Sequence, residues 1–360
     1  MNKKACIVTL YSNNNYGNKL QNYAVQTVLE KKDFDVESLK LYPGKFKKNG
    51  FIYKILNRLI WNIKLIFFKV GYKNKNFKKF YKSYMKMNKN KIIRHENHKY
   101  LANKYDYFIV GSDQVWNPYF GLDYDLEFLE FSNKEKNIAF SASIGVSEIP
   151  EEKKEKYIKG INNIKYLSLR EDKGENIVKE LTGREDAIVL VDPTMLLTRE
   201  EWKKVAKKPE QLGKEKYILN YFLGELSEER KSIINNLAQK NGWKIINILD
   251  PNDPFYDAGP SEFVYLEENA ELICTDSFHS CVFGILMNTP FEVFIREDEY
   301  VSMNSRLETL LSKFGLENRY YRSGELNEEH LKCDYTNAYK VLEDERKKAN
   351  DFLNKALDIE

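Results

Sequence analysis

The sequence predicts an α/β protein with two Rossmann-like domains. Short apolar runs recur along the chain, and each leads into a loop bearing glycine or charge, a pattern typical of parallel strands. The first unit, residues 5–39, reads as strand, loop, helix and strand. At 360 residues the chain is also long for one core. We therefore expect an N-terminal domain over 1–165, a C-terminal domain over 166–335, and a last helix over 336–360 that can return to the N-terminal domain.

The composition is that of a globular protein. The apolar fraction is 42%, and 57 basic residues nearly balance 54 acidic ones. The four cysteines are scattered, with no paired spacing and no metal-ligand spacing to histidine, so we expect neither a disulfide framework nor a zinc site. The opening residues turn polar too soon for a signal peptide. We expect a reduced, cytoplasmic protein.

The opening unit contains the first candidate binding residues. An apolar strand over residues 5–10 leads into a polar, asparagine-rich loop and then a helix. In such folds this loop usually faces the ligand, which makes Asn15, Tyr16, Gly17 and Gln21 candidates for substrate contact. The alternative is that asparagine and glycine only supply turn conformations here.

Residues 45–94 differ in kind from the rest of the chain. This window holds 16 Lys and Arg and no Asp or Glu, so the remainder carries 41 basic against 54 acidic residues. Residues 51–70 are rich in aliphatic and aromatic side chains, but lysine and arginine interrupt them too often for a spanning helix. We expect attachment to the anionic inner face of the cell membrane, and we prefer it to nucleic acid. A helical pair that packs on its own protein or on a second subunit is the third alternative.

The same strand-and-loop pattern continues through both halves of the chain. In a parallel sheet these loops meet at the carboxyl edge, where ligands bind. The apolar runs are residues 107–110, 137–140, 167–169, 188–191, 217–222, 244–249 and 271–274.

The last of these runs breaks into a polar turn and resumes as an apolar-faced helix. Asp276, Ser277 and His279 therefore stand where a strand ends and a helix begins. The unpaired N–H groups and the positive dipole end of such a helix suit an anion. The alternative is that Asp276 or Ser277 only caps the helix and that His279 is a satisfied, partly buried histidine.

Several motifs occur in the order seen in one enzyme family. They are Asn14-Asn15-Tyr16-Gly17, Gly111-Ser112-Asp113-Gln114-Val115-Trp116-Asn117, Ser141-Ala142-Ser143-Ile144-Gly145, Arg170-Glu171-Asp172-Lys173-Gly174, Val191-Asp192-Pro193-Thr194, Thr275-Asp276-Ser277-Phe278-His279 and Asn304-Ser305-Arg306. Each motif is common by itself, but the ordered set resembles the polysaccharide pyruvyl transferase family over roughly residues 5–315.

This resemblance implies a GT-B-like fold, in which two Rossmann-like domains face each other across a cleft. It implies transfer of an enolpyruvyl unit from phosphoenolpyruvate to a sugar, with closure of a pyruvate ketal. The membrane attachment expected for residues 45–94 adds that the acceptor is a lipid-linked polysaccharide precursor. It also implies that no metal or other cofactor is needed and that the C-terminal domain binds the donor.

The reaction needs a proton donor, a base, and groups that hold a carboxylate and a phosphate. Histidine titrates near neutral pH, so His279 is the acid/base candidate, and Asp276 is expected to orient it or to act as base. Arg170 and Arg306 are expected to bind the donor together with Ser277, because a guanidinium suits both anionic groups. For Arg170 the alternative is a structural ion pair with its acidic neighbours in the sequence.

The acceptor side and one departure from the family complete the site hypothesis. Asp113 and Gln114 are expected to line the acceptor side. The family usually has glycine directly after the histidine, whereas this chain has Ser280, also taken as a donor-binding residue. The sequence leaves open whether Ser280 changes the donor. The rival enzyme is a GT-B glycosyltransferase that uses a nucleotide sugar, with Asp123-Tyr124-Asp125 as a lone metal-binding pattern or a surface loop, and the non-enzyme alternative is a protein that only binds glycans or membranes.

Overall fold

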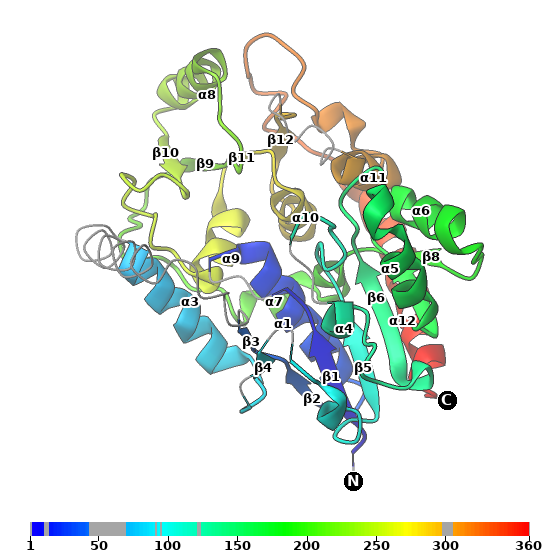
Figure 1. The fold of residues 1–360 in the computed structure, drawn as a ribbon. Coiled ribbons are helices and arrows are strands. Elements are labelled where there is room, and N and C mark those ends of the chain that lie inside the picture. The colour runs from blue at the N-terminus through cyan, green and yellow to red at the C-terminus, as the bar shows by residue number, and fades with distance from the viewer. Residues whose placement is uncertain are drawn as a thin grey trace, which may run out of the picture.

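A computed structural model describes residues 2–10, 14–42, 70–90, 92–93, 96–120, 124–296 and 305–359. Two parallel sheets, each flanked by helices, form two domains (Figure 1). Strands such as β1 (Lys4–Val8) are apolar on both faces, as parallel strands covered by helices must be.

The first sheet has six parallel strands in the order β2-β1-β5-β6-β7-β8. It continues past residue 165, the domain boundary expected from the sequence, because β7 and β8 pair with it rather than with the second sheet. The first domain therefore extends at least to Val189. The other strands are β2 (Asp35–Ser38), β5 (Tyr107–Val110), β6 (Asn137–Ala142), β7 (Tyr166–Leu169) and β8 (Ile188–Val189), with a small separate pair of β3 (Leu41–Tyr42) and β4 (Ile92–Ile93).

The second sheet has four parallel strands in the order β10-β9-β11-β12. In each sheet the strand that comes first in the chain lies in the interior, and later strands are added on both sides of it, so the strand order reverses beside it. Ligands typically bind at such a switch point. In the first sheet this point lies between β1 and β5, and in the second between β9 and β11. The strands are β9 (Tyr217–Tyr221), β10 (Lys244–Asn247), β11 (Leu272–Thr275) and β12 (Phe291–Val293).

One hydrophobic core runs through both domains. Tyr16 on α1 stacks on Phe263 of α9 with ring centres 4.6 Å apart, and Trp202 on α7 meets Phe283 of α10 at 5.0 Å. The helices are α1 (Tyr16–Glu30), α4 (Tyr124–Glu127), α5 (Glu151–Asn162), α6 (Asp172–Thr182), α7 (Arg199–Lys203), α8 (Glu228–Asn241), α9 (Pro260–Asn269), α10 (Phe278–Met287), α11 (Ser305–Phe314) and α12 (Thr336–Ala356).

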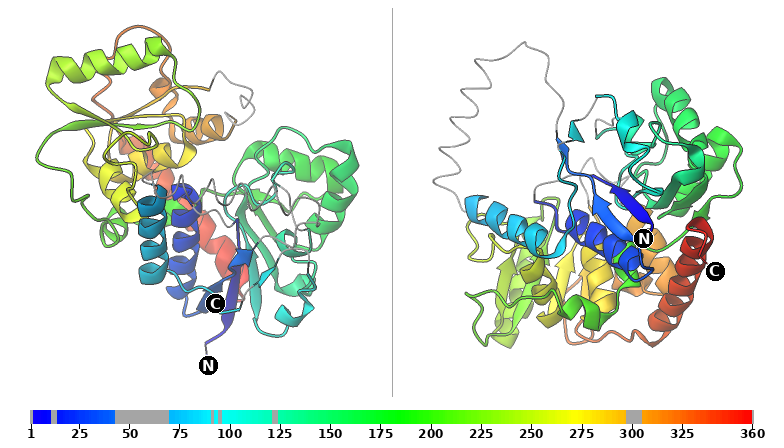
Figure 2. Two further views of the ribbon diagram at one scale, coloured as in Figure 1. Left: turned by 60° about the vertical axis from the view of Figure 1, so that its left-hand side comes forward. Right: turned by 90° about the horizontal axis from the view of Figure 1, so that it is seen from below.

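The last helix, α12, runs from the second domain back to the first (Figure 2). Phe352 stacks on Phe140 of β6, and the Leu357 carbonyl accepts a hydrogen bond from Tyr107 Oη on β5. Tyr107 and Phe140 both belong to the first sheet, so the end of the chain ties the two domains together.

Part of the basic segment forms helix α3 (Val70–Tyr84), which packs on its own protein. Phe77 and Phe80 are buried, and the Phe77 ring lies 4.9 Å from that of Tyr16. Residues 43–69 lie outside the described residues. Among the described helices, none is both long and apolar enough to cross a membrane. The exposed lysines of α3 are Lys75, Lys78, Lys79 and Lys82.

Candidate functional site

A cavity of about 160 Å³ opens between the carboxyl edges of the two sheets, at their switch points. Loops that follow β1 and β5 form its first-domain wall, and loops that follow β9, β11 and β12 form the other with the starts of α10 and α11. The lining residues are Asn15, Asp113, Gln114, Leu223, Asp276, Ser277, Phe278, His279, Arg296, Arg306 and Leu307.

His279, on the first turn of α10, reaches across to the first domain. A β-carbon built on Gly17 of α1 would lie 2.1 Å from His279 Nδ1, so only glycine leaves room for the ring. The other ring nitrogen, Nε2, lies 3.6 Å from Asp192 Oδ2. The carboxylate beside His279 is therefore Asp192 and not Asp276, which the sequence analysis had expected to orient it.

Asp192 lies at the end of the first sheet and is almost fully buried. Its Oδ2 accepts hydrogen bonds from Arg170 Nη1 at 2.7 Å and Ser112 Oγ at 3.0 Å, and its Oδ1 accepts from Thr194 Oγ1 at 2.7 Å. Burial alone would raise the pKa of this carboxyl, but contact with His279 and the charge of Arg170 hold the pKa well below its usual range. Asp192 is thus a buried carboxylate that joins groups from both domains.

Arg170 stands directly behind the cavity wall. Besides its pairing with Asp192, its Nη2 lies 3.8 Å from Asp113 Oδ1, and its guanidinium carbon lies 4.5 Å from the centre of the Phe278 ring. Burial would lower the pKa of Arg170, but Asp192 and Asp113 raise it, so the side chain stays charged. Its Nε and Nη2 are buried with no hydrogen-bond partner among the described residues. The ion pairs of Arg170 go to Asp192 and Asp113, whereas its neighbour Glu171 accepts from the backbone of the β6–α5 loop.

Asp276 holds the second-domain wall together. Its Oδ1 accepts from the Leu223 backbone N–H at 2.7 Å, and its Oδ2 accepts from the Gly224 N–H and from Arg296 Nε, both at 2.8 Å. These partners follow β9 and β12, so every one of these contacts stays within the second domain.

Positive charge gathers at the start of α10. Ser277 occupies the N-cap position without a side-chain capping bond, and the first N–H groups of this ten-residue helix offer a site for an anion. Arg306 Nε is buried with no hydrogen-bond partner among the described residues. Burial and the nearby charge of Arg170 lower the pKa of Arg306 to about 10. With Arg296, three arginines therefore surround this end of the helix.

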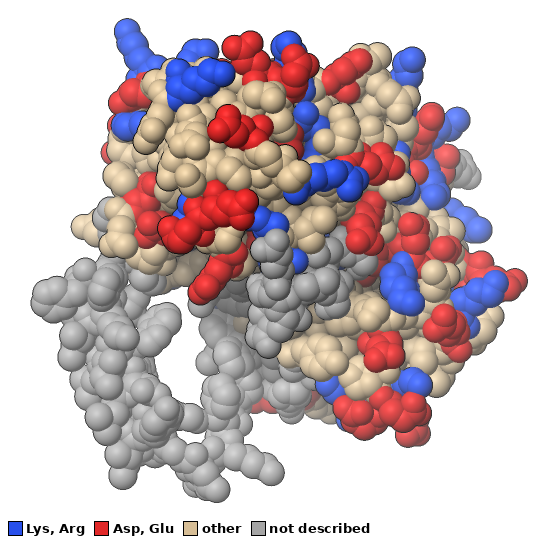
Figure 3. Space-filling model, turned by 90° about the horizontal axis from the view of Figure 1, so that it is seen from above, with Lys and Arg blue, Asp and Glu red and all other residues tan. Residues whose placement is uncertain are grey.

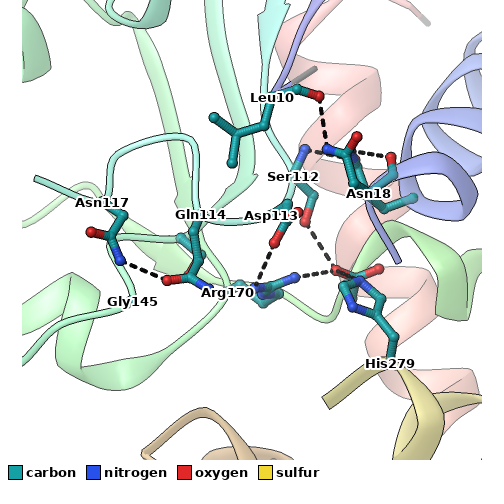
Figure 4. A network of polar contacts seen from close by, with 12 residues as sticks. Leu10, Asn18, Ser112, Asp113, Gln114, Asn117, Gly145, Arg170 and His279 are labelled. Atoms are coloured by element: carbon teal, nitrogen blue, oxygen red, sulfur yellow. Dashed lines mark hydrogen bonds and ion pairs between the residues drawn. The ribbon is translucent and has the colours of Figure 1, made fainter. Parts of the chain in front are cut away.

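Polar side chains of the first domain line the opposite wall. Figure 4 shows two of them, Asp113 and Gln114, with their polar contacts. Asn15 caps α1 by accepting from the Asn18 N–H at 2.9 Å. Gln114 Oε1 accepts from Asn117 Nδ2 at 2.7 Å, which fixes the loop that carries Asp113. Asn15, Asp113 and Gln114, all expected on the acceptor side, do line the cavity.

Besides Arg170, four predicted site residues are not part of the cavity wall. Gly17 lies against the His279 ring. Tyr16 is fully buried against Phe263. Gln21 is buried, and its amide bonds the loops that follow β1 and β5. Ser280 is fully buried and donates to Glu267 Oε1 at 2.6 Å, so its hydroxyl points into the core.

Two residues of the site were given no role from the sequence: Asp192, which was noted only within a motif, and Arg296. Asp192 follows the apolar run of residues 188–191, so the rule that selected Asp276 would also have found it. Arg296 follows the short strand β12 by three residues, and no local pattern distinguishes it from a surface arginine.

Metal-binding side chains do not cluster in the part of the chain that the structure describes: no group of three or more His, Cys, Asp or Glu is placed to hold an ion. The metal-binding pattern considered at Asp123-Tyr124-Asp125 is only partly described: Asp123 lies outside the described residues, and Tyr124 and Asp125 begin the short helix α4.

Comparisons with known proteins place this architecture. A family model described as polysaccharide pyruvyl transferase matches residues 15–297. None of the curated proteins matches the sequence. Among solved structures, the UDP-GlcNAc 2-epimerase from Methanocaldococcus jannaschii is 14% identical, with a TM-score of 0.53 over 95% of this chain and 92% of that chain. That score supports a shared fold, and identity this low carries nothing about activity.

Two further solved structures match over nearly the whole chain. The UDP-GlcNAc 2-epimerase from Neisseria meningitidis is 15% identical, with a TM-score of 0.49 over 98% of this chain and 100% of that chain. MurG from Acinetobacter baumannii is 10% identical, with a TM-score of 0.41 over 99% of each chain. The α/β architecture with two parallel sheets agrees with the GT-B-like fold expected from the sequence.

Proposed function

The chain belongs to the polysaccharide pyruvyl transferase family, and from that membership we propose that it transfers the enolpyruvyl unit of phosphoenolpyruvate to hydroxyls of a lipid-linked sugar. The product is a pyruvate ketal on a surface polysaccharide precursor. The family match supports an enzyme of polysaccharide pyruvylation, and the geometry of the cavity supports the choice of donor.

One observation carries the choice of donor. Arg306 lines the cavity and Arg170 lies directly behind its wall, and each has buried N–H groups with no hydrogen-bond partner among the described residues. Buried polar groups are almost always paired, so these open arginine N–H groups favour an anionic ligand. Phosphoenolpyruvate offers a carboxylate and a phosphate, which match arginine forks and a helix N-terminus.

We favour phosphoenolpyruvate over the nucleotide-sugar donor of a glycosyltransferase, because the arginines and the start of α10 offer groups for both a carboxylate and a phosphate.

The reaction that we propose forms two C–O bonds at C2 of phosphoenolpyruvate and breaks its C2–O bond to phosphate. A sugar oxygen adds to C2 of phosphoenolpyruvate while a proton reaches C3, which becomes the methyl group. The C2–O bond to phosphate then breaks, phosphate leaves, and a second sugar hydroxyl bonds to C2. Of the two hydroxyl protons released, one replaces the proton consumed at C3 and the other leaves with phosphate.

We assign the proton transfers to His279, with Asp192 as its positioning residue and Asp276 as support for Arg296. Asp192 is almost fully buried, and its Oδ2 lies 3.6 Å from His279 Nε2, where it can hold the imidazole in place. Asn15, Asp113 and Gln114 face the cavity from the first domain and are assigned to the acceptor.

Ligand-induced thermal stabilisation tests the donor. Phosphoenolpyruvate should raise the Tm of the wild type, and Arg306→Leu should abolish that rise while leaving the unliganded Tm close to that of the wild type. The control is Arg322→Leu, at an exposed position away from the cavity, which should keep the response. A rise with nucleotides or nucleotide sugars, and none with phosphoenolpyruvate, would instead favour the glycosyltransferase.

Activity tests the role of His279. The variant His279→Ala should retain the phosphoenolpyruvate response but lose about 10²–10⁴-fold in turnover, the usual contribution of a positioned acid/base. Turnover is measured as phosphate released in the presence of acceptor. Unchanged turnover would remove His279 from the chemistry.

We further propose that the basic segment of residues 45–94 attaches the enzyme to the inner face of the cell membrane, where a lipid-linked acceptor is presented. The support is its charge in the sequence and the four exposed lysines of α3. On the face seen in Figure 3, acidic and basic side chains of the described residues are interspersed. Flotation should recover more protein with anionic than with neutral vesicles, and equal recovery at physiological salt would contradict an electrostatic attachment.

A further inference from the structure

A second, larger cavity lies in the C-terminal domain. Its volume is about 480 Å³, and it opens where β9 and β10 end beside α8. Asn220 and Asn247 line it from the two strand ends, and Asn235 lines it from α8. Its place at a carboxyl edge of a parallel sheet is where ligands bind in this class of fold.

One loop separates this cavity from the donor cavity. In residues 222–226, Phe222 and Leu226 face the second cavity, whereas Leu223 lines the donor cavity. The same loop is fixed by Asp276, which accepts from the Leu223 N–H at 2.7 Å. The two cavities therefore lie on either side of the loop of residues 222–226.

The wall of the second cavity combines amides with apolar surface. Asn220 Nδ2 donates to Asn247 Oδ1 at 2.9 Å, which orients both amides. Asn220 is 8% exposed, and its Oδ1 has no hydrogen-bond partner among the described residues. A ligand that supplies an O–H or N–H donor would complete this set.

The charges of the cavity balance, which argues against an anion. It is lined by one cation, Lys231, and one anion, Asp250. Lys231 Nζ already pairs with Glu228 Oε1 at 2.6 Å. The donor cavity differs in its arginines: Arg296 and Arg306 line it beside Asp113 and Asp276, and Arg170 lies directly behind its wall.

We propose that this second cavity is a carbohydrate subsite, which holds an uncharged sugar residue of the acceptor next to the residue that is pyruvylated. Sugar rings present hydroxyls at their edges and C–H groups on their faces, which match the amides and the side chains of Phe222 and Leu226. The inference rests on the proposed transfer to a sugar and adds a second contact point for that acceptor.

The test measures sugar binding without the donor. Saturation-transfer NMR is run on the full chain with a mixture of glucose, galactose, mannose, N-acetylglucosamine and N-acetylmannosamine. Asn235→Trp places a bulky ring at an exposed helix position that lines the cavity, so it blocks the cavity without disturbing the core. The matched control is Asn236→Trp, since Asn236 is the next residue, is also exposed, and is not part of the lining.

We expect at least one sugar to bind the wild type and the control, and Asn235→Trp to weaken that binding by roughly tenfold or more. Loss of the amide in Asn247→Ala should weaken it as well. Absence of sugar binding to the wild type, or equal binding by all variants, overturns the subsite. Nucleoside mono- and diphosphates are tested in parallel, and nucleotide binding that Asn235→Trp abolishes also overturns it.

The donor response separates this inference from the proposed function. All four proteins should show the wild-type rise in Tm with phosphoenolpyruvate, because the donor cavity is untouched. If that rise is present and sugar binding is indifferent to position 235, the subsite is wrong and the function stands. If the rise is absent from the wild type, the proposed donor is wrong whatever the sugars do.

Discussion

Two sets of contacts fix the start of α10, and they come from different domains. Gly17 and Asp192 reach His279 from the first domain, across the interface. Asp276 and Ser280 bond only within the second domain. The ring nitrogens proposed to move protons are therefore placed by the opposite domain, whereas the helix itself is held by its own.

We therefore expect the two sets of contacts to affect different quantities, turnover for one and stability for the other. Contacts that cross the interface exist only when the two carboxyl edges meet, so a change there should alter turnover. Contacts within the second domain persist whatever the first domain does, so a change there should alter the free energy of unfolding.

The largest effect is expected for Asp192→Asn. The amide removes the charge that balances Arg170 and His279. We expect turnover to fall by about 10²–10⁴-fold and the free energy of unfolding to fall by about 3 kcal/mol, as for a broken buried ion pair. Phosphate release and urea unfolding measure the two. The control is Asp186→Asn, whose side chain is 61% exposed, and it should change neither.

The pH dependence of stability tests the same carboxylate independently. The usual pKa of an aspartate in an unfolded chain is about 3.9. The pKa of Asp192 in the folded protein lies well below that value. Its stabilisation is therefore fully present above that value and is lost as the pH falls through the folded pKa. The advantage of the wild type over Asp192→Asn should shrink steadily as the pH falls below about 4 and go on shrinking through the acid range. Parallel curves for the two proteins would contradict the pairing.

A smaller loss is expected for Gly17→Ala, which removes no functional group. The added methyl must displace the His279 ring, and a shift of about 1 Å costs on the order of 10²-fold in rate. Gly174→Ala in α6 is the matched control, since its added methyl would make only ordinary contacts. That control should keep full turnover and gain up to about 1 kcal/mol of stability. Equal turnover in both variants would show that the ring is not held by α1.

Local sequence patterns predicted the strands, turns and helices that carry the site residues. They did not predict which residues those side chains contact in the other domain. The strand, polar turn and helix around Asp276 and His279 lie within one short stretch, so periodicity and capping residues predict them. The contact of His279 with Asp192 joins two domains, and no local pattern encodes which strand ends meet. The helix α1 was predicted for similar local reasons, but the burial of Tyr16 depends on α3 and α9.

The domain boundary expected at residue 165 was wrong for a related reason. The run at residues 167–169 is as apolar as those of the second sheet, and a strand's sequence does not say which sheet it joins. Pairing with β6 decides this, and that pairing is a tertiary contact.

A modest effect on turnover is expected for Asp276→Asn. The amide places N–H donors against the backbone N–H groups of Leu223 and Gly224 and against Arg296. We expect the free energy of unfolding to fall by about 1–3 kcal/mol, with a turnover loss under about tenfold. A loss as large as that of Asp192→Asn would show that Asp276 acts directly on the substrate, and the comparison of the two domains would fail.

The smallest effect on turnover is expected for Ser280→Gly, which restores the residue usual in the family. Ser280 donates to Glu267 at 2.6 Å inside the core. Burial raises the pKa of Glu267 well above its usual range, which favours the protonated carboxyl, and Ser280 is its hydrogen-bond partner inside the core. Loss of the hydroxyl should cost about 1–2 kcal/mol of stability, and glycine within a helix about another 1 kcal/mol.

Turnover and the phosphoenolpyruvate response of Ser280→Gly should stay within about twofold of the wild type, because a buried hydroxyl that faces Glu267 does not approach the donor. The double variant Ser280→Gly with Glu267→Leu separates the stability lost with the hydroxyl from the stability lost by placing glycine in a helix. It removes the buried carboxyl that would lose its partner, so it should recover part of the lost stability. Weaker donor binding in Ser280→Gly, by tenfold or more, would mean that the helix start and the core pair are coupled. In that case the contacts within the second domain would also set the chemistry.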